Sequence, residues 1–220
     1  MILFAADQHY GQHCGRVLYE QLKDEFPMEF HENDWSCFEQ DLVSRYDLLV
    51  LNLIADTCGV PPPAAAAEPC VDAFVRAGKP ILLLHGASAA FWPWAWWRSL
   101  VGYRWVRPQD PDGVEASHHP RRPYLAKVSK TQHPLSTHLQ DVDMPEDEIY
   151  LNLEQTAAVV TLMETRTDEG TFPMCYETMT PFGGHIAAYL PGHLPEVVAQ
   201  PGNVANCRAL IRWLLDPNGT

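Results

Sequence analysis

The chain has 220 residues, of which 46% are hydrophobic and 20% are charged. This composition excludes intrinsic disorder, and the length suffices for one α/β domain that folds without a disulfide or a metal. Asp and Glu number 28 against 15 Lys and Arg, which gives a formal net charge of −13. Such a field repels phosphate backbones and anionic lipids, so we expect neither nucleic acid nor a membrane surface as a partner.

Apolar runs alternate with helical patterns over the first 85 residues. Residues 15–26 and 63–77 have helical features, and Pro27 and Gly78 are placed to end them. Apolar runs of strand length occupy 1–6, 28–31, 47–54 and 80–85. This alternation predicts a parallel sheet covered by helices on both faces.

The rest of the chain is predicted to be more elaborate. The segment 91–97, FWPWAWW, holds four of the seven tryptophans, and 107–123 is rich in Pro, Arg, His and Asp, which indicates a long loop. Residues 203–215 form an amphipathic pattern typical of a closing helix. Further strands are expected at 124–128, 149–153, 157–163 and 184–190. We find no linker, and predict a single domain over 1–220.

The N-terminal residues and the cysteines indicate the cellular compartment. The first residues, MILFAADQHYGQH, have neither the basic segment nor the cleavage site of a signal peptide, and no apolar run is long enough to span a membrane. The six cysteines are scattered with no C-x-x-C pair, which favours free thiols over a disulfide or zinc framework. We therefore expect a cytoplasmic protein.

Three histidines follow predicted strands. In open parallel sheets ligands bind beyond the carboxyl ends of the strands, and His9, His85 and His193 come after the first strand, the strand at 80–85 and the strand at 184–190. A single histidine is more often a surface residue or a satisfied polar group. Three at matching positions favour one shared site.

The turn after His85 allows two interpretations of Ser88. Gly86-Ala87-Ser88-Ala89-Ala90 is one residue short of the nucleophile elbow G-x-S-x-G, because Ala90 replaces the second glycine. Ser88 is therefore either the nucleophile of a serine hydrolase with His193 as its base, or a helix N-cap, which is the commoner role. No cysteine lies between Cys70 and Cys175, so the cysteine that a glutaminase needs at this elbow is absent.

An acidic cluster, Pro145-Glu146-Asp147-Glu148-Ile149-Tyr150, offers groups for acid/base chemistry. We expect Glu146 and Asp147 to form a solvated turn. Glu148 and Tyr150 alternate with Ile149 at the start of a predicted strand, so they should share a face and a site. Histidines together with Glu148 could also hold a divalent metal such as zinc or manganese.

The aromatic run leaves two interpretations open. Phe91 and Trp92 could wall a sugar pocket, since apolar sugar faces stack on aromatic rings, or the tryptophans could fill the core under a loop. If it is exposed, the run would suit a homo-oligomer contact. The pair His118-His119 lies in polar surroundings between Glu115 and Arg121. A solvated loop is expected there, and metal binding is the less favoured alternative.

Four segments follow one another along the chain: PILLLHGASAAFWPWAWWRSLVG, QHPLSTHLQDVDMPEDEIY, AAYLPGH and NCRALIRWLL. No single motif is very specific, but the ordered set resembles the trehalose-utilisation (ThuA-like) family over about residues 1–215. The resemblance implies an α/β fold with a flavodoxin-like, three-layer, doubly wound, mostly parallel sheet. This is the fold of class I glutamine amidotransferases, and family members lack the glutaminase cysteine.

The resemblance also implies a role in sugar metabolism, including trehalose and keto-glycosides. The expected function is an enzyme acting on a sugar or keto-glycoside without glutaminase activity; the alternative is a carbohydrate-binding or sensing protein. Leu194 stands where the family often has an acidic residue, which removes an orienting partner of His193. The expected catalytic residues are His9, His85, Glu148, Tyr150 and His193, and the expected substrate contacts are Gly86, Ser88, Phe91 and Trp92.

Overall fold

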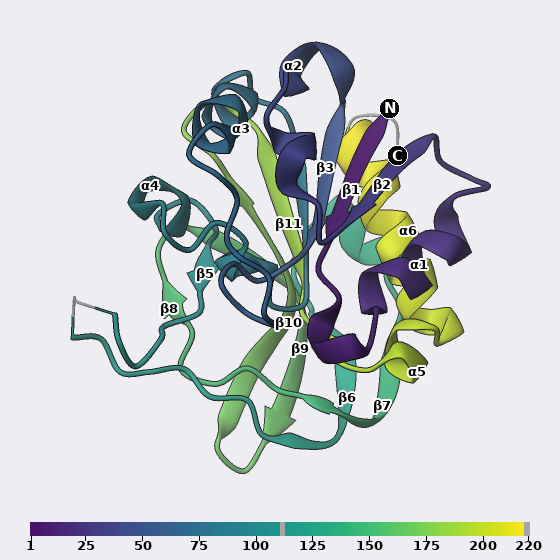
Figure 1. Cartoon of the computed structure of the whole chain (residues 1–220). Coiled ribbons are helices and arrows are strands. Elements are labelled where there is room, and N and C mark those ends of the chain that lie inside the picture. Colours follow the sequence, from purple (N-terminus) through teal and green to yellow (C-terminus); the bar gives the residue numbers. More distant parts are fainter. Residues whose placement is uncertain (111–112, 218–220) are drawn as a thin grey trace.

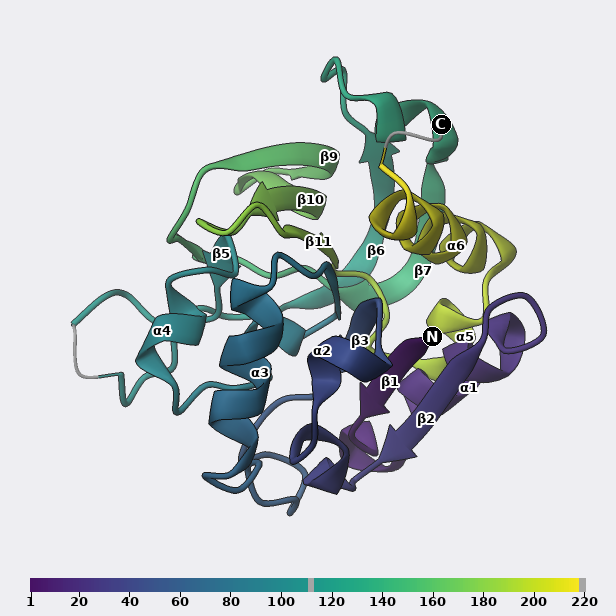
Figure 2. The same cartoon turned by 90° about the horizontal axis from the view of Figure 1, so that it is seen from above.

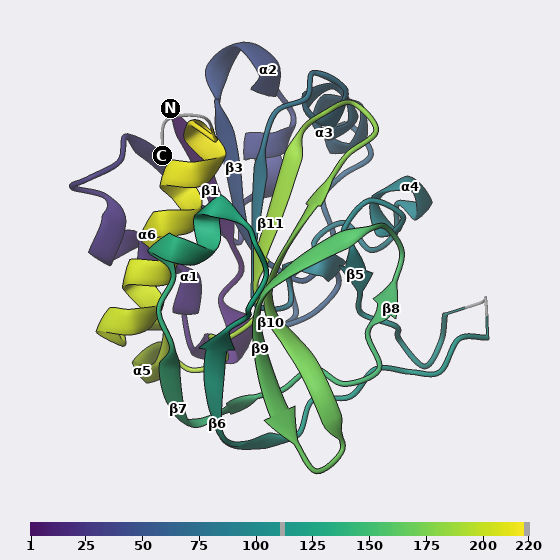
Figure 3. The same ribbon diagram turned by 180° about the vertical axis from the view of Figure 1, so that it is seen from behind.

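A nine-stranded mixed sheet runs through the computed structural model, which describes residues 1–110 and 113–217 (Figure 1). The sheet order is β2-β1-β3-β4-β11-β10-β9-β6-β7, and its first five strands are parallel whereas the last four pairings are antiparallel. The parallel strands are β1 Ile2–Ala6, β2 Met28–Glu32, β3 Leu48–Asn52, β4 Ile81–Leu84 and β11 His185–Tyr189. The others are β6 Arg121–Val128, β7 Val142–Glu148, β9 Val159–Thr167 and β10 Gly170–Met179, seen from behind in Figure 3. A separate two-stranded sheet pairs β5 Tyr103–Arg104 with β8 Glu154–Gln155.

Helices cover both faces of the sheet (Figure 2). One face carries α1 Cys14–Leu22, α5 Pro195–Val198 and α6 Pro201–Leu215. The opposite face carries α2 Leu42–Arg45, α3 Ala67–Arg76 and α4 Ala95–Arg98. The 3-10 helices are η1 His9–Gly11, η2 Trp35–Phe38, η3 Ala87–Ala89 and η4 Pro134–His138. This arrangement confirms the three-layer, doubly wound α/β fold.

Strand β1 shows why the sheet has two cores. Phe4 packs into the cluster that includes α1 and α6, whereas its neighbours Leu3 and Ala5 pack into the cluster that includes α3. All five residues of the strand are buried because side chains alternate between the two covered faces. A continuous apolar run is therefore the pattern this position requires, and each buried Ile, Leu or Phe side chain contributes roughly 1.5–3 kcal/mol.

Several predicted elements need correction. The run 149–153 is not a strand: β7 ends at Glu148, and the buried residues after it lie in a connection where Leu151 bridges to His118. Strand β10 was not predicted; Pro173 interrupts its pattern, and a bulge in its pairing with β9 accommodates it. The helices predicted at 15–26 and 63–77 are shorter than expected.

The aromatic run 91–97 lies mostly in the core. Phe91 and Trp97 are fully buried, and Phe91 stacks on Trp94 with ring centroids 4.4 Å apart. The predicted loop 107–123 follows, with residues 111–112 outside the described part, and it gives way to β6 at Arg121. No helix of the described chain is both long and apolar enough to cross a membrane.

Candidate active site

A cavity of about 330 Å³ opens where strands β1, β4, β7 and β11 end. Residues from seven separate stretches of the chain line it, and they include all five of the residues expected to be catalytic. The lining residues are His9, Tyr10, Gln12, Ile54, Thr57, His85, Gly86, Ala89, Trp105, Arg107, His119, Arg121, Glu148, Tyr150 and His193. The carboxyl edge of the sheet therefore holds the cavity, as the topology rule predicts.

His85 occupies a constrained turn directly after β4. Its φ is 54°, a left-handed conformation that is unusual outside glycine and that clusters at functional sites. Its Nδ1 donates to the carbonyl oxygen of Leu190 at 2.9 Å, so in the neutral ring Nε2 carries the lone pair. That nitrogen lies 2.9 Å from the hydroxyl of Tyr150 and 3.4 Å from Oε2 of Glu148.

Gly86 lets Ile54 and Tyr150 pack close to the turn, because a Cβ there would lie 2.4 Å from Cδ1 of Ile54 and 3.3 Å from the Tyr150 hydroxyl. The turn continues into η3, whose N-cap is Gly86. Ser88 lies inside η3, so the interpretation of Ser88 as an N-cap is wrong. Ser88 is buried and does not line the cavity.

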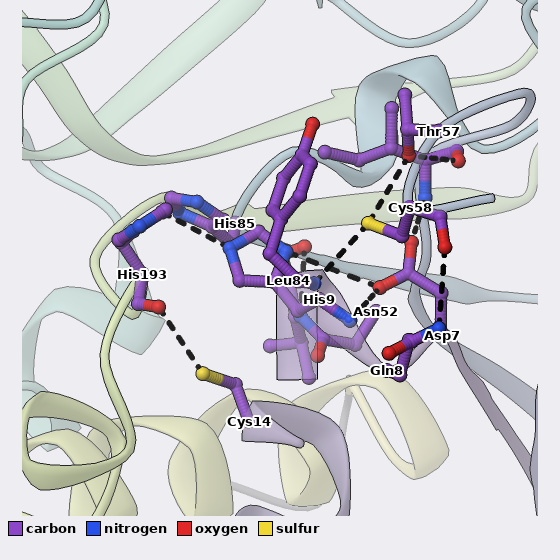
Figure 4. Close-up of polar contacts among 12 residues, drawn as sticks. Asp7, Gln8, His9, Cys14, Asn52, Thr57, Cys58, Leu84, His85 and His193 are labelled. Atoms are coloured by element: carbon purple, nitrogen blue, oxygen red, sulfur yellow. Dashed lines mark hydrogen bonds and ion pairs between the residues drawn. The ribbon is translucent and has the colours of Figure 1, made fainter. Parts of the chain in front are cut away.

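His9 is held by the buried carboxylate of Asp7. Oδ1 of Asp7 accepts from the backbone N–H of His9 at 2.8 Å, and Oδ2 accepts from the backbone N–H of Ile54 at 2.7 Å. The chain after β1 is thereby tied to the chain after β3. His9 points toward His193, with its Nε2 3.0 Å from Nδ1 of that residue (Figure 4).

His193 depends on Asp147, which the sequence led us to expect in a solvated turn. Asp147 is fully buried, and it accepts hydrogen bonds from the backbone N–H groups of Gly192 and His193 at 2.8 and 3.0 Å. The expectation was wrong because β7 turns Asp147 toward the core, where Tyr124 donates a third hydrogen bond at 3.1 Å. Asp147 thus positions His193 although Leu194 provides no carboxylate.

Glu148 lies among the ring nitrogens of two histidines and the guanidinium of Arg121. Its Oε1 is 3.0 Å from Nδ1 of His193, 3.0 Å from Nδ1 of His119 and 3.5 Å from Nε of Arg121. Burial by itself would raise the pKa of Glu148, but the contacts with His193 and His85 outweigh it and hold the pKa well below its usual range. Glu148 is therefore an ionised carboxylate at neutral pH.

The same contacts separate the pKa values of the histidines. Burial would lower the pKa of His85, but the Glu148 carboxylate outweighs burial and raises it. Burial, reinforced by His85 and His193, lowers the pKa of His9 to about 3, so its ring is neutral. Burial also raises the pKa of Tyr150 well above 10, which keeps its hydroxyl protonated.

Sequence reasoning missed part of the cavity wall. His119 was expected to be solvated; its side chain is half exposed, but its ring reaches Glu148. Arg121 also contacts Glu148 and donates to Nε2 of His193. Arg121 is the register partner of Glu148 in the β6–β7 pairing, and His119 precedes it by two residues. Only knowledge of that pairing would have identified them.

The aromatic wall also differs from the expected one. Neither Phe91 nor Trp92 is a lining residue. Trp105 lines the cavity instead, with its ring 5.1 Å from that of Tyr150. Trp92 lies behind the wall, where the guanidinium of Arg107 stacks 4.4 Å above its ring. Trp92 therefore supports Arg107, which does reach the cavity.

The sheet, the helices on both of its faces and the position of the cavity define an α/β protein with the glutamine amidotransferase-like fold. The family model described as trehalose utilisation, ThuA, matches residues 4–214. The chain therefore belongs to the ThuA family, which supports a carbohydrate-related role. A search of functionally curated proteins gives no significant match.

Solved structures agree on the fold. A putative ThuA-like protein from Parabacteroides merdae has a TM-score of 0.78 at 18% identity, over 98% of this chain and 89% of that one. A second putative ThuA-like protein, from Bacteroides uniformis, has a TM-score of 0.69 at 15% identity, over 97% and 89%. A glutamine amidotransferase from Thermotoga maritima has a TM-score of 0.53 at 8% identity, over 98% and 97%.

Proposed function

We propose that this ThuA-family protein is an enzyme that acts on a sugar or keto-glycoside, such as a trehalose derivative. The observation that carries the proposal is the convergence of His9, His85, Glu148, Tyr150 and His193 in one cavity with an aromatic wall. Buried ionisable side chains are costly, and sites that collect several of them in a cleft are typical of catalysis.

The shape of the cavity supports a small carbohydrate. Its volume of about 330 Å³ is at the low end for ligand pockets, which fits one sugar ring. Trp105 and Tyr150 offer aromatic surface to the apolar face of a sugar, and Arg107 and Arg121 offer N–H donors to hydroxyl or carbonyl oxygens. A second sugar ring of a disaccharide would extend toward the open mouth.

The polar groups support proton transfer at that ring. Nε2 of His85 and the carboxylate of Glu148 face the cavity 3.4 Å apart, and the Tyr150 hydroxyl lies beside them. A base and a hydroxyl donor within hydrogen-bond reach of one position can take a proton from a substrate hydroxyl or acidic C–H and return it elsewhere. We assign His85 and Glu148 to this role and Tyr150 to orientation.

The test is turnover of a panel that contains trehalose, its keto derivatives, simple glucosides and keto-glucosides, followed by NMR. We expect one class to be consumed by the wild-type protein, and His85→Ala and Glu148→Gln to lower the rate by roughly 10²–10⁴-fold. His138→Ala is the matched control, since His138 is exposed on η4 and does not line the cavity.

The alternative is a carbohydrate-binding or sensing protein on the same fold. Saturable binding of a panel sugar with no turnover would favour that alternative and overturn the enzyme proposal. A folded His85→Ala variant with full activity would overturn the assignment of His85. Melting temperatures within a few degrees of the wild type show that the variants are folded.

A further inference from the structure

We propose that His9, His85 and His193 bind one divalent transition-metal cation, zinc by preference, with a coordination position open to the cavity. Each histidine offers one ring nitrogen, and these three nitrogens all lie within 4.8 Å of one another. All three side chains are buried and all three line the cavity. Three imidazoles with a free fourth position are a ligand set of catalytic zinc.

The orientation of the rings fits metal ligation. Metal-binding histidines usually donate their other ring N–H to a carbonyl or carboxylate. Nδ1 of His85 donates to the carbonyl of Leu190, and Nδ1 of His9 lies 3.9 Å from Oδ1 of Asp7. In His85 this leaves Nε2 to face the shared centre, and in His9 it is Nε2 that lies 3.0 Å from Nδ1 of His193.

The spacing of the nitrogens also fits. Two nitrogens at about 2.0–2.1 Å from one tetrahedral zinc lie about 3.4 Å from each other. Nε2 of His9 and Nδ1 of His193 are 3.0 Å apart, so both can reach one cation after a small movement. The His9 ring centroid lies 4.9 Å from that of His85 and 4.8 Å from that of His193.

Glu148 provides an independent observation. Its buried Oε1 has no hydrogen-bond partner among the described residues, although it lies 3.0 Å from ring nitrogens of His193 and His119. An acceptor this close to two potential donors without a hydrogen bond indicates donors that do not point at it. A buried, unsatisfied carboxylate oxygen costs free energy, which a neighbouring dication would recover.

Several present contacts must change when the cation binds. Nε2 of His9 and Nδ1 of His193 now share a hydrogen bond, whose proton must leave before both nitrogens can bind the cation. The Tyr150 hydroxyl contacts Nε2 of His85, and Arg121 donates to Nε2 of His193. If Nδ1 of His193 binds the cation, its Nε2 is protonated and cannot accept from Arg121. The Arg121 side chain is 45% exposed and already lies near Glu148, so it can turn away. Arg121→Ala should therefore strengthen metal binding, because it removes a competing cation.

Ligand chemistry decides between the metals. Imidazole nitrogens suit zinc, whereas manganese and magnesium prefer carboxylates and water. Binding of the cation does not depend on the proposed function. Any use of it in turnover, where it would polarise a substrate oxygen, does rest on that function. With the cation bound, Nε2 of His85 is a metal ligand, and proton transfer falls to Glu148 alone.

The experiment measures metal directly in the full-length protein. After chelator treatment and dialysis, zinc chloride or manganese chloride is titrated by calorimetry, and bound metal is counted by elemental analysis. We expect one zinc per chain in the wild type and at least about a 100-fold weaker affinity in each of His9→Gln, His85→Gln and His193→Gln, since a lost ligand costs more than an outer-shell partner. His138→Ala should bind as the wild type does. Circular dichroism verifies folding, and cobalt(II) absorption of the wild type reports nitrogen ligation without any variant.

Several results would overturn the proposal. One is a wild type that binds no more zinc than the His9→Gln/His85→Gln/His193→Gln variant, or unchanged zinc affinity in all three single variants. A cobalt spectrum dominated by thiolate charge transfer would assign the metal to cysteines instead. Manganese binding without zinc would overturn the choice of metal. Zinc-loaded protein that turns over no sugar would contradict the proposed function and leave the metal site supported.

Discussion

The backbone N–H of His193 donates a hydrogen bond to Oδ1 of Asp147, 3.0 Å away and 46 positions earlier in the sequence. The other oxygen of the same carboxylate accepts from the N–H of Gly192 and from the Tyr124 hydroxyl. The turn after β11, in the parallel half of the sheet, is thus attached to the end of β7 in the antiparallel half. Asp147 therefore sets the position of a cavity histidine without touching the cavity.

Replacement of Asp147 should destabilise the protein. In Asp147→Asn one carboxylate oxygen becomes an NH₂ group that faces N–H or O–H donors. We expect a loss of about 1–3 kcal/mol in the free energy of unfolding, the cost of leaving buried polar groups unsatisfied. Urea denaturation measures it. The adjacent Glu146 is exposed, so Glu146→Gln should change stability by no more than about 0.5 kcal/mol. Equal stability of the two variants would contradict the role given to Asp147.

Glu177 should be a second stabilising carboxylate, remote from the cavity. Its Oε1 accepts from His185 at 2.7 Å and from the Trp213 indole at 2.8 Å, and its Oε2 lies 2.8 Å from Nε2 of His133. These contacts join β10 and β11 to η4 and α6. Glu177→Ala should lower the free energy of unfolding by about 1–3 kcal/mol, because it leaves three donors without their acceptor.

The control for Glu177 is a more exposed glutamate in the adjacent strand. Glu164 on β9 makes a long ion pair with Arg166 at 3.5 Å, and the Arg166 side chain is 80% exposed. Glu164→Ala should therefore cost about 0–1 kcal/mol. Thermal unfolding of both variants compares them, and a smaller loss for Glu177→Ala than for Glu164→Ala would refute the prediction.

A side chain at position 86 should compete with Ile54 for space. The added Cβ of Gly86→Ala would lie 2.4 Å from Cδ1 of Ile54, so we expect overpacking to cost about 1–3 kcal/mol. Ile54→Ala removes the clashing atoms. The double variant should consequently be more stable than the sum of the two single changes predicts. A double-mutant cycle by chemical denaturation tests this; strict additivity would show that the two side chains do not compete for space.

Thiol reactivity should divide the six cysteines into two groups. Cys58 and Cys70 are partly exposed, whereas Cys14, Cys37, Cys175 and Cys207 are buried. Burial raises the pKa of Cys14, Cys37 and Cys207 to about 12 and that of Cys175 well above its usual value. A raised pKa means less thiolate at pH 8, and the thiolate is the reactive form. A chromogenic disulfide reagent should therefore react quickly with two thiols and with the other four only after denaturation. Four or more fast thiols in the native protein would refute this division.

Elements with strong local patterns were predictable. The runs at 1–6, 47–54 and 80–85 became β1, β3 and β4, because a strand covered on both faces must be apolar throughout. The convergence of His9, His85 and His193 followed from the same topology, since parallel strands end at one edge of the sheet. The local sequence was sufficient to predict a strand wherever the burial of its apolar side chains determined its position.

Tertiary structure alone decided the surroundings of those histidines. Adjacent residues of the acidic cluster, Glu146 and Asp147, differ completely in exposure, and nothing in their local sequence separates them. Which of them is buried depends on the pairing of β7 with β6, and so does the contact of Arg121 with Glu148. That pairing places Arg121 opposite Glu148 and Arg122 opposite Asp147, residues that are far apart in the sequence. The sequence, through its alternation of apolar strands and helices, therefore determined which strand ends form the site. The long-range register between strands determined which charged residues surround it.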